Sequence, residues 1–279
     1  MTTPPFSLHH LPPVTSVLGQ LFAPVRADCL ACLAVTERPG AAELTALATA
    51  RGIVVGGEGE ARGQALRFTP PTNDGWGYEM RIAQFGCVET RAESWHDFFN
   101  ALVWLRFPQA KAALSAAHYA AMSSAGRGQR RDALTHFDEC GVLLVARDPA
   151  YLAQVREFRW RELFWDNRAA LAANLDVVIF GHATYEQLLQ PFRGLTAKAI
   201  LLHLPPEHAY WQMAASERWA FLDAYLADYL SHPVTTLTRP RDLHPFPLLG
   251  LPKLVPENNT ASYYDDTWQF RSGRRGKQS

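Results

Sequence analysis

The sequence predicts a single α+β domain, and three observations lead to this class. Two short, mainly apolar runs, Leu175–Phe180 and Ala199–Leu204, have the length of buried β-strands. A third run, Trp95–Phe107, is apolar around almost the whole circumference of a helix, which is typical of a helix buried in a core. Strands and helices follow no regular βαβ order. We expect one mixed domain over residues 27–271, with a β-hairpin, a few short strands and several buried helices.

The composition is that of a globular protein with a sizeable core. Of 279 residues, 48% are hydrophobic and 19% are charged. Lys+Arg and Asp+Glu both number 27, so the chain has no global field to attract nucleic acid, and such a partner would need a local patch. No apolar run reaches the roughly 18 residues of a membrane span, and the N-terminus lacks a signal-peptide pattern. We expect a cytoplasmic protein whose partner is a small molecule or a protein.

The first quarter of the chain is expected to begin with an irregular arm. Residues 1–26 are rich in proline, and the apolar segment Asp28–Val35 follows. A helix after Pro39-Gly40 is expected to end at Gly52. Short strands are predicted at Ile53–Val55 and Leu66–Phe68.

Cys29 and Cys32 have C-x-x-C spacing. A structural zinc site needs two further ligands, and no second C-x-x-C or H-x-x-x-H is present. Buried structural cysteines are therefore favoured over a zinc or redox site.

The middle of the chain predicts a strand and then two helices. Apolar and charged residues alternate in 77–89, as in a half-exposed strand. Ser94 and Asp97 form a capping-box-like start for the buried helix. Pro108 is expected to end that helix and to begin a second one with small residues at helical spacing.

The remaining elements follow from local patterns. Alternation in Leu134–Glu139, a Cys140-Gly141 turn and the run Val142–Val145 predict a β-hairpin. Asp148-Pro149 is expected to cap a helix over about 150–173, whose arginines and aromatics are interleaved with acidic residues, as in a salt-bridged amphipathic helix. Further predictions are a loop at 123–131, a strand at Leu175–Phe180, a helix from His182 to Gln190, a strand at Ala199–Leu204, a helix at Ala214–Leu230, irregular structure beyond Pro233 and a flexible basic tail at 272–279.

Polar residues on the two central helices are candidate binding residues. His96 and Asn100 are four apart and share one face of the buried helix, which also carries Arg106. His118 lies in a similar row on the next helix. Buried polar groups need partners, so these side chains could equally tie the helices to nearby backbone. We expect His96 and Asn100 to hydrogen-bond to the segment after Leu254, which also contains the candidates Tyr264 and Asp265.

His182 and Glu186 are the main candidates for catalysis. They are four apart at the start of a helix that follows a strand, so both side chains share one face. An imidazole and a carboxylate there can bind a divalent metal or act as a base and its orienting group. The alternative is a helix cap and a surface ion pair.

Two pairs of carboxylates are further candidates, Asp138-Glu139 and Asp265-Asp266. Oxygen ligands of this kind can hold a divalent metal. Adjacent residues on a strand point to opposite faces, so only one of each pair is expected to reach a given ion. We select Asp138 as the third catalytic candidate, with a solvated turn as the alternative for both pairs.

Several segments together resemble one known family. They are YEMRI (78–82), GCVETR (86–91), WHDFFNALVWLRFP (95–108), LTHFDECG (134–141), FGHATYEQLLQP (180–191), LTAKA (195–199) and NNTASYYDDTWQFR (258–271). This pattern resembles the proteobacterial domain-of-unknown-function family number 3025. The family has no established activity, so the resemblance implies no catalytic residues, but it suggests that these segments converge on one surface.

Two functions are compatible with the sequence. The first is a metal-assisted hydrolase that uses a divalent metal with His182, Glu186 and Asp138, helped by His96 or His118. The second is a non-catalytic module that binds a small molecule or a protein in a groove of tryptophans and the proline-rich C-terminal third. Serine-hydrolase, P-loop and dinucleotide-binding motifs are absent from the sequence.

Overall fold

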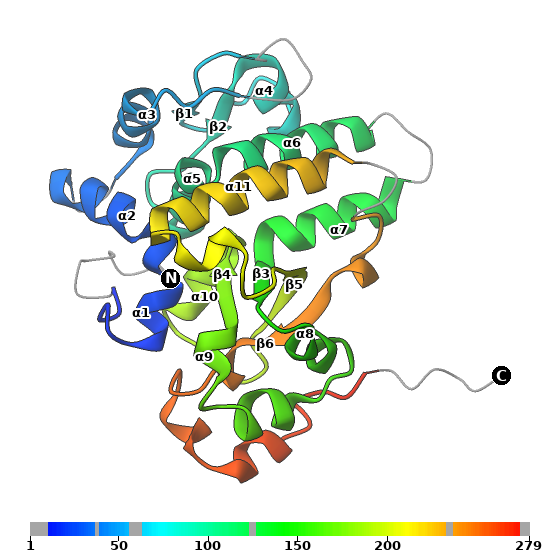
Figure 1. Cartoon of the computed structure of the whole chain (residues 1–279). Coiled ribbons are helices and arrows are strands. Elements are labelled where there is room, and N and C mark those ends of the chain that lie inside the picture. The colour runs from blue at the N-terminus through cyan, green and yellow to red at the C-terminus, as the bar shows by residue number, and fades with distance from the viewer. Residues whose placement is uncertain (1–10, 37–38, 56–62, 123–126, 233–236, 274–279) are drawn as a thin grey trace.

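A four-stranded mixed sheet lies at the centre of the molecule, beneath a layer of long helices (Figure 1). The computed structural model describes residues 11–36, 39–55, 63–122, 127–232 and 237–273. The strand order is β4-β3-β5-β6, with β3 parallel to β5 and antiparallel to β4, and β5 antiparallel to β6. The strands are β3 (Gly141–Ala146), β4 (Leu175–Ile179), β5 (Thr196–His203) and β6 (His244–Pro247). Every residue of β3 is buried, as its apolar sequence predicts for a central strand.

The long helices α6, α7 and α11 lie above the sheet in Figure 1, and α8, α9 and the C-terminal segments lie below it. The buried apolar side chains of the sheet and of the helices on both sides of it form one continuous core, so the described residues form a single α+β domain. None of the described helices has the length and apolar character needed to cross a membrane. The helices around the sheet are α5 (Trp95–Arg106), α6 (Pro108–Met122), α7 (Arg127–Cys140), α8 (Pro149–Arg156), α9 (Leu171–Asn174), α10 (His182–Leu188) and α11 (Ala215–Ser231).

The predicted start and burial of α5 are confirmed. Ser94 Oγ accepts a hydrogen bond from the amide of Asp97, and the Asp97 carboxylate accepts from the backbone and side chain of Arg91. Residues 98–105 are all buried. Phe107 leaves the helical conformation and Pro108 begins α6, as predicted.

The start of α6 is held by a carboxylate of α11. Asp223 is buried and accepts hydrogen bonds from the amides of Gln109 at 3.2 Å and Ala110 at 2.8 Å. These amides belong to the first turn of α6, where no intrahelical acceptor exists. The contact therefore fixes how the two helices pack.

The irregular arm predicted for residues 1–26 is wrong in its second half. Two helices, α1 (Val17–Leu21) and α2 (Ala23–Val35), begin before residue 26. Ser16 caps α1 and Pro24 is tolerated in the first turn of α2. Cys29 and Cys32 are free and buried in α2, as predicted, and burial raises the pKa of both thiols to about 12. The helix α3 (Ala41–Ala50) ends just before Gly52, also as predicted.

The strand predicted over 77–89 is instead the helix α4 (Tyr78–Phe85) followed by a short strand. Arg81, which alternation placed in solvent, is buried and pairs with Asp74 and Glu89. Two strands, β1 (Arg67–Thr69) and β2 (Cys87–Glu89), form a separate parallel pair. The residues predicted as a strand at 53–55 contribute only an isolated bridge between Val54 and Ala65.

The predicted hairpin at 134–145 is wrong in its first half, which is the end of α7. Leu134 and Phe137 are buried together with Ala133, while Thr135 and His136 are exposed, and this is the period of a helix. The turn predicted at Cys140-Gly141 is a direct junction of helix and strand. Because α7 is a helix, Asp138 and Glu139 need not point to opposite sides.

The remaining predictions have mixed outcomes. The helix expected at 150–173 is divided into α8, a π-helical turn at Glu162–Asp166 and α9, with Phe158 at a positive φ of 58°. The predicted strands at 175–180 and 199–204 and the helices at 182–190 and 214–230 are confirmed as β4, β5, α10 and α11. The segment beyond Pro233, predicted as irregular, contains β6 and 3-10 turns at Leu248–Gly250, Pro256–Asn259 and Ala261–Asp265. The loop predicted at 123–131 is wrong from Arg127 onward, where α7 begins. Residues 1–10, 56–62, 123–126 and 274–279, on which other predictions fall, lie outside the described residues.

Candidate functional site

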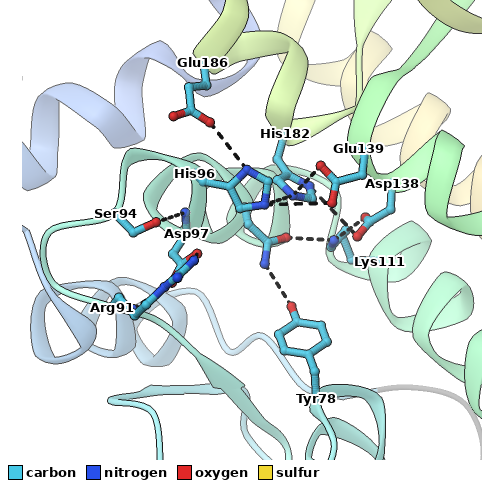
Figure 2. A network of polar contacts seen from close by, with 11 residues as sticks. Tyr78, Arg91, Ser94, His96, Asp97, Lys111, Asp138, Glu139, His182 and Glu186 are labelled. Carbon is cyan, nitrogen blue, oxygen red and sulfur yellow. Dashed lines mark hydrogen bonds and ion pairs between the residues drawn. The ribbon is translucent and has the colours of Figure 1, made fainter. Parts of the chain in front are cut away.

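Three helices bring two histidines and a glutamate together at one point, which Figure 2 shows. His96 is in the first turn of α5, Glu139 in the last turn of α7, and His182 is the first residue of α10. One ligand-type atom from each side chain lies within 4.8 Å of the others. The His182 side chain is buried with 4% exposed, whereas His96 and Glu139 are 37% and 38% exposed. The group therefore has one interior member and two that open towards solvent.

Two glycines bring Glu139 next to His182. A Cβ on Gly181 would lie 2.3 Å from the amide nitrogen of Gly141 and 2.5 Å from the carbonyl oxygen of Glu139. The amides of Phe180 and Gly181 both donate to the carbonyl of Gly141, at 3.0 and 2.8 Å. The end of α7 and the start of α10 thus touch backbone to backbone, which only glycine permits at this distance.

The three side chains face one another through specific atoms. The Nε2 atoms of His96 and His182 lie 3.0 Å apart. One oxygen of Glu139 lies 3.5 Å from Nε2 of His182, and its other oxygen lies 3.8 Å from Nε2 of His96. Both imidazoles therefore direct the same nitrogen at one carboxylate.

The other nitrogen of each imidazole faces a second carboxylate. Nδ1 of His96 lies 3.4 Å from Glu186, and Nδ1 of His182 lies 3.9 Å from Asp138 (Figure 2). Carboxylates that hydrogen-bond the far nitrogen orient metal-binding histidines in many proteins. Nδ1 of His182 has no hydrogen-bond partner among the described residues, so Asp138 acts on this imidazole by its charge. The site thus has an inner group, His96, Glu139 and His182, and an outer pair, Glu186 and Asp138.

Burial determines the charge of the inner group. It lowers the pKa of His182 to about 4, and the attraction of Asp138 offsets this only in part. Burial also raises the pKa of Glu139, against the opposing effect of His96. His182 is therefore neutral near pH 7, as a metal-binding imidazole must be.

Asp138 is the end of a chain of buried polar side chains. Lys111, with 3% of its side chain exposed, donates to Asp138 Oδ1 at 2.5 Å and to Asn100 Oδ1 at 2.8 Å. Asn100 Nδ2 in turn donates to the Tyr78 hydroxyl at 2.8 Å. Burial alone would raise the pKa of Asp138, but Lys111 and His182 outweigh it and hold that pKa below its ordinary value. Asp138 therefore stays ionised.

A cleft of about 460 Å³ opens beside the inner group. Glu79 on its wall accepts a hydrogen bond from Ser115 at 2.7 Å, and burial raises the pKa of this carboxyl to about 7. Burial lowers the pKa of His118, also on the wall, to about 4. The residues that line the cleft are Pro71, Tyr78, Glu79, Glu89, Arg91, His96, Asp97, Asn100, His118, Thr135, Asp138, Glu139 and His182.

Comparison with known proteins identifies the family. The model of the family described as Protein of unknown function (DUF3025) matches residues 67–274, which is most of the chain. The chain belongs to the DUF3025 family. The resemblance in the sequence is thereby confirmed, and the matched part contains every residue of the inner group and of the outer pair. Searches of curated proteins and of solved structures find no match.

In this DUF3025 protein, four of the predicted site residues gather at the inner group. They are His96, Asp138, His182 and Glu186, although Glu186 faces His96 rather than His182. Asn100 and His118 line the cleft. The expected hydrogen bonds of His96 and Asn100 to the segment after Leu254 are wrong. His96 contacts His182, and the Asn100 amide joins Tyr78 and Lys111.

The other three predicted residues have different surroundings. The Arg106 guanidinium lies over the ring of Trp219 at 5.3 Å. The Tyr264 hydroxyl donates to the carbonyls of Gly250 and Asn258, and burial raises its pKa to about 12. Asp265 accepts from Arg161 at 2.9 Å. None of the three lines the cleft described above.

The sequence reasoning missed Lys111 and Tyr78 as site residues, and within the candidate pair Asp138-Glu139 it selected Asp138 alone. The strand predicted over 77–89 also gave Tyr78 the wrong surroundings. The helical spacing of Ala133, Leu134 and Phe137 is the signal that would have put Glu139 on a helix beside Asp138.

Proposed function

We propose that this protein is a metal-dependent hydrolase that acts on a small molecule in the cleft. The observation that carries the proposal is the use of both nitrogens of each histidine. The Nε2 atoms face Glu139 and each other, while each Nδ1 faces a separate carboxylate. Histidines that only tie helices together have no need of this arrangement, whereas metal-binding histidines adopt it regularly.

The distances within the inner group support a shared ion. Nitrogen and oxygen ligands lie about 2.0–2.2 Å from zinc, so two ligands of one ion are at most about 4.4 Å apart. The nearest atoms of the two histidines are 3.0 Å apart, and the two oxygens of Glu139 lie 3.5 Å from Nε2 of His182 and 3.8 Å from Nε2 of His96, so the carboxylate reaches both imidazoles with one oxygen each. Two histidines and one carboxylate are also a known ligand set for hydrolytic zinc.

The surroundings of the inner group favour hydrolysis over a purely structural ion. Three protein ligands leave at least one position open, which distinguishes catalytic from structural zinc sites. A metal at such a position supplies Lewis acidity and lowers the pKa of a bound water. On the cleft wall Glu79, with a pKa of about 7, is suited to accept and return a proton near neutral pH.

Metal binding is the first test. We expect the melting temperature of the metal-free protein to rise by about 5 °C with one member of a Zn²⁺, Mn²⁺ and Fe²⁺ panel, because a ligand at 100 times its Kd stabilises the fold by about 2.7 kcal/mol. His96→Ala and Glu139→Gln should abolish the rise. His136→Ala is the matched control, since His136 is exposed on the same helix as Glu139. Equal shifts in all four proteins would refute the proposed site.

Hydrolysis is the second test. The metal-loaded protein is assayed with p-nitrophenyl esters, p-nitroanilides and bis-p-nitrophenyl phosphate. We expect turnover of one class that requires the metal and is lost in Glu139→Gln. Metal binding without turnover of any class would contradict the hydrolase and favour the alternative, a non-catalytic module that binds a small molecule.

A further inference from the structure

The hydrogen bonds between Lys111, Asn100 and Tyr78 run in one direction only. An ammonium group has donors and no acceptor, so Lys111 must donate to the oxygen of Asn100. The amide nitrogen of Asn100 then points the other way and donates to the Tyr78 hydroxyl. The orientation of the Asn100 amide is thus fixed by a neighbouring charge.

The proton of the Tyr78 hydroxyl consequently points away from Asn100. No acceptor for this proton is found among the described residues, and Tyr78 is one of the residues that line the cleft. Burial raises the pKa of the phenol, so it keeps its proton at neutral pH. Tyr78, a residue of the cleft wall, therefore has a neutral O–H donor that no described side chain accepts, and Lys111 orients it through Asn100.

The charges around the cleft restrict the ligand further. Three of its carboxylates are paired with cations: Asp138 with Lys111, Glu89 with Arg81, and Asp97 with Arg91. Within the described residues, no lysine or arginine forms an ion pair with Glu139 or Glu79, and burial raises the pKa of Glu79 to about 7. Among the side chains that line the cleft, a divalent metal on Glu139 would leave about one positive charge, which matches one anionic group on the ligand; Glu186 contacts the other nitrogen of His96 and does not line the cleft.

We propose that Tyr78 donates its hydroxyl proton to a neutral carbonyl oxygen of the substrate, whose single carboxylate lies at the metal. The substrate class is therefore a small monocarboxylate that also carries an amide or a similar carbonyl group. This inference rests on the metal site of the proposed function. It adds a specificity residue that neither the family nor the sequence motifs indicate.

The test uses the metal-loaded protein and three probes, the monoamides of malonic, succinic and glutaric acid. Binding is measured by calorimetry, and acetate is the control for attachment to the metal alone. We expect one monoamide to bind best and Tyr78→Phe to weaken it about tenfold, as the loss of one hydrogen bond does. Acetate should bind equally to both proteins. For the succinic monoamide, 4-methylpentanoate is the apolar analogue of the same shape, and its affinity should not depend on Tyr78.

Two further variants test whether the direction of the Tyr78 proton matters, or only the packing of its ring. Tyr225→Phe is the matched control, because Tyr225 is a half-buried tyrosine on α11 that does not line the cleft. Asn100→Asp keeps the phenol but supplies a carboxylate that accepts the Tyr78 proton and turns it away from the cleft. We expect Asn100→Asp to lose monoamide affinity as Tyr78→Phe does, and Tyr225→Phe to bind like wild type.

The outcomes distinguish this inference from the function on which it rests. If the wild type binds no divalent metal, both are overturned. If metal and acetate bind but no monoamide does, or if wild type and Tyr78→Phe bind the monoamides equally, only the role of Tyr78 is overturned. Wild-type affinity in Asn100→Asp would also overturn it, because the direction of the proton would then have no effect.

Discussion

Replacing Asp223 by asparagine should remove a pH dependence of stability that originates at the contact between α6 and α11. Burial raises the pKa of Asp223 from 3.8 to about 6, although the amides of Ala110 and Gln109 favour the ionised form. In the folded protein the proton therefore leaves this carboxyl at higher pH than in the unfolded chain. The contribution to stability is fully present below pH 3.8 and is lost as the pH rises through 6.

The size of the effect follows from the two pKa values. They differ by about two, and one pKa unit corresponds to about 1.4 kcal/mol, so ionisation of Asp223 should lower the free energy of unfolding by roughly 3 kcal/mol between pH 4 and pH 7. Asp223 has 3% of its surface exposed, so screening by solvent is small. Asparagine keeps an oxygen for the Ala110 amide but cannot ionise. Any cost of its NH₂ group near Gln109 is the same at every pH.

The assay is urea unfolding of wild type and Asp223→Asn at pH 4, 5, 6 and 7. Taking the difference between the two proteins removes every other group that titrates in this range. The stability of wild type relative to the variant should fall by about 3 kcal/mol from pH 4 to pH 7. A flat difference, or one that rises with pH because the positive end of α6 favours the charge, would refute the reasoning.

Three further variants test packing and buried polar contacts by urea unfolding. Leu102→Ala in α5 should cost about 2–5 kcal/mol, since Leu102 is fully buried, and a cost below 1 kcal/mol would contradict the interior position of α5. Lys111→Met should lower the free energy of unfolding by about 3–5 kcal/mol, because it leaves Asp138 as an unpaired buried charge. Adding Asp138→Asn should recover most of this loss, and purely additive effects of the two substitutions would contradict the ion pair. Asn258→Ala should cost about 2–3 kcal/mol, because Asn258 donates to the carbonyls of Leu249 and Leu251. The control is Asn259→Ala at an exposed position, which should change stability by less than about 1 kcal/mol, and similar losses in both variants would contradict a structural role of the Asn258 hydrogen bonds.

Elements with purely local signals could be predicted from the sequence. An apolar run marks the strand at Leu175–Phe180, and Gly181 separates it from the helix that follows. The helix α5 has Ser94 as its cap and a proline just beyond its end. The sequence of residues 134–140 fits both the two-residue repeat of a strand and the spacing of a helix. Leu134, His136 and Asp138 alternate as in a strand, yet Leu134 and Phe137 also share a helix face. The helical spacing is thus present in the sequence beside the alternation, and the packing of the Leu134 and Phe137 face against the core decides between the two.

The candidate site was predictable one residue at a time but not as a constellation. Histidine and glutamate at helical spacing indicated His182 and Glu186, and the face of α5 indicated His96. Which of them meet depends on contacts between residues far apart in the chain, such as Glu139 with His182. The hydrogen bond from Lys111 to Asp138 could not be predicted either, because it joins side chains of two different helices.

The backbone contact between Gly141 and Gly181 has a consequence for how this site can be recognised in other chains. Each ligand-type residue of that junction stands next to a glycine or two residues from one, Glu139 before Gly141 and His182 after Gly181. A methyl group at position 181 would meet the backbone of residues 139–141 and push α7 and α10 apart, although Glu139 and His182 would both still be present. A chain can therefore retain the histidines and the glutamate and still lack the site. A useful signature pairs the motifs E-x-G and G-H, because the glycines place the side chains and the side chains alone do not.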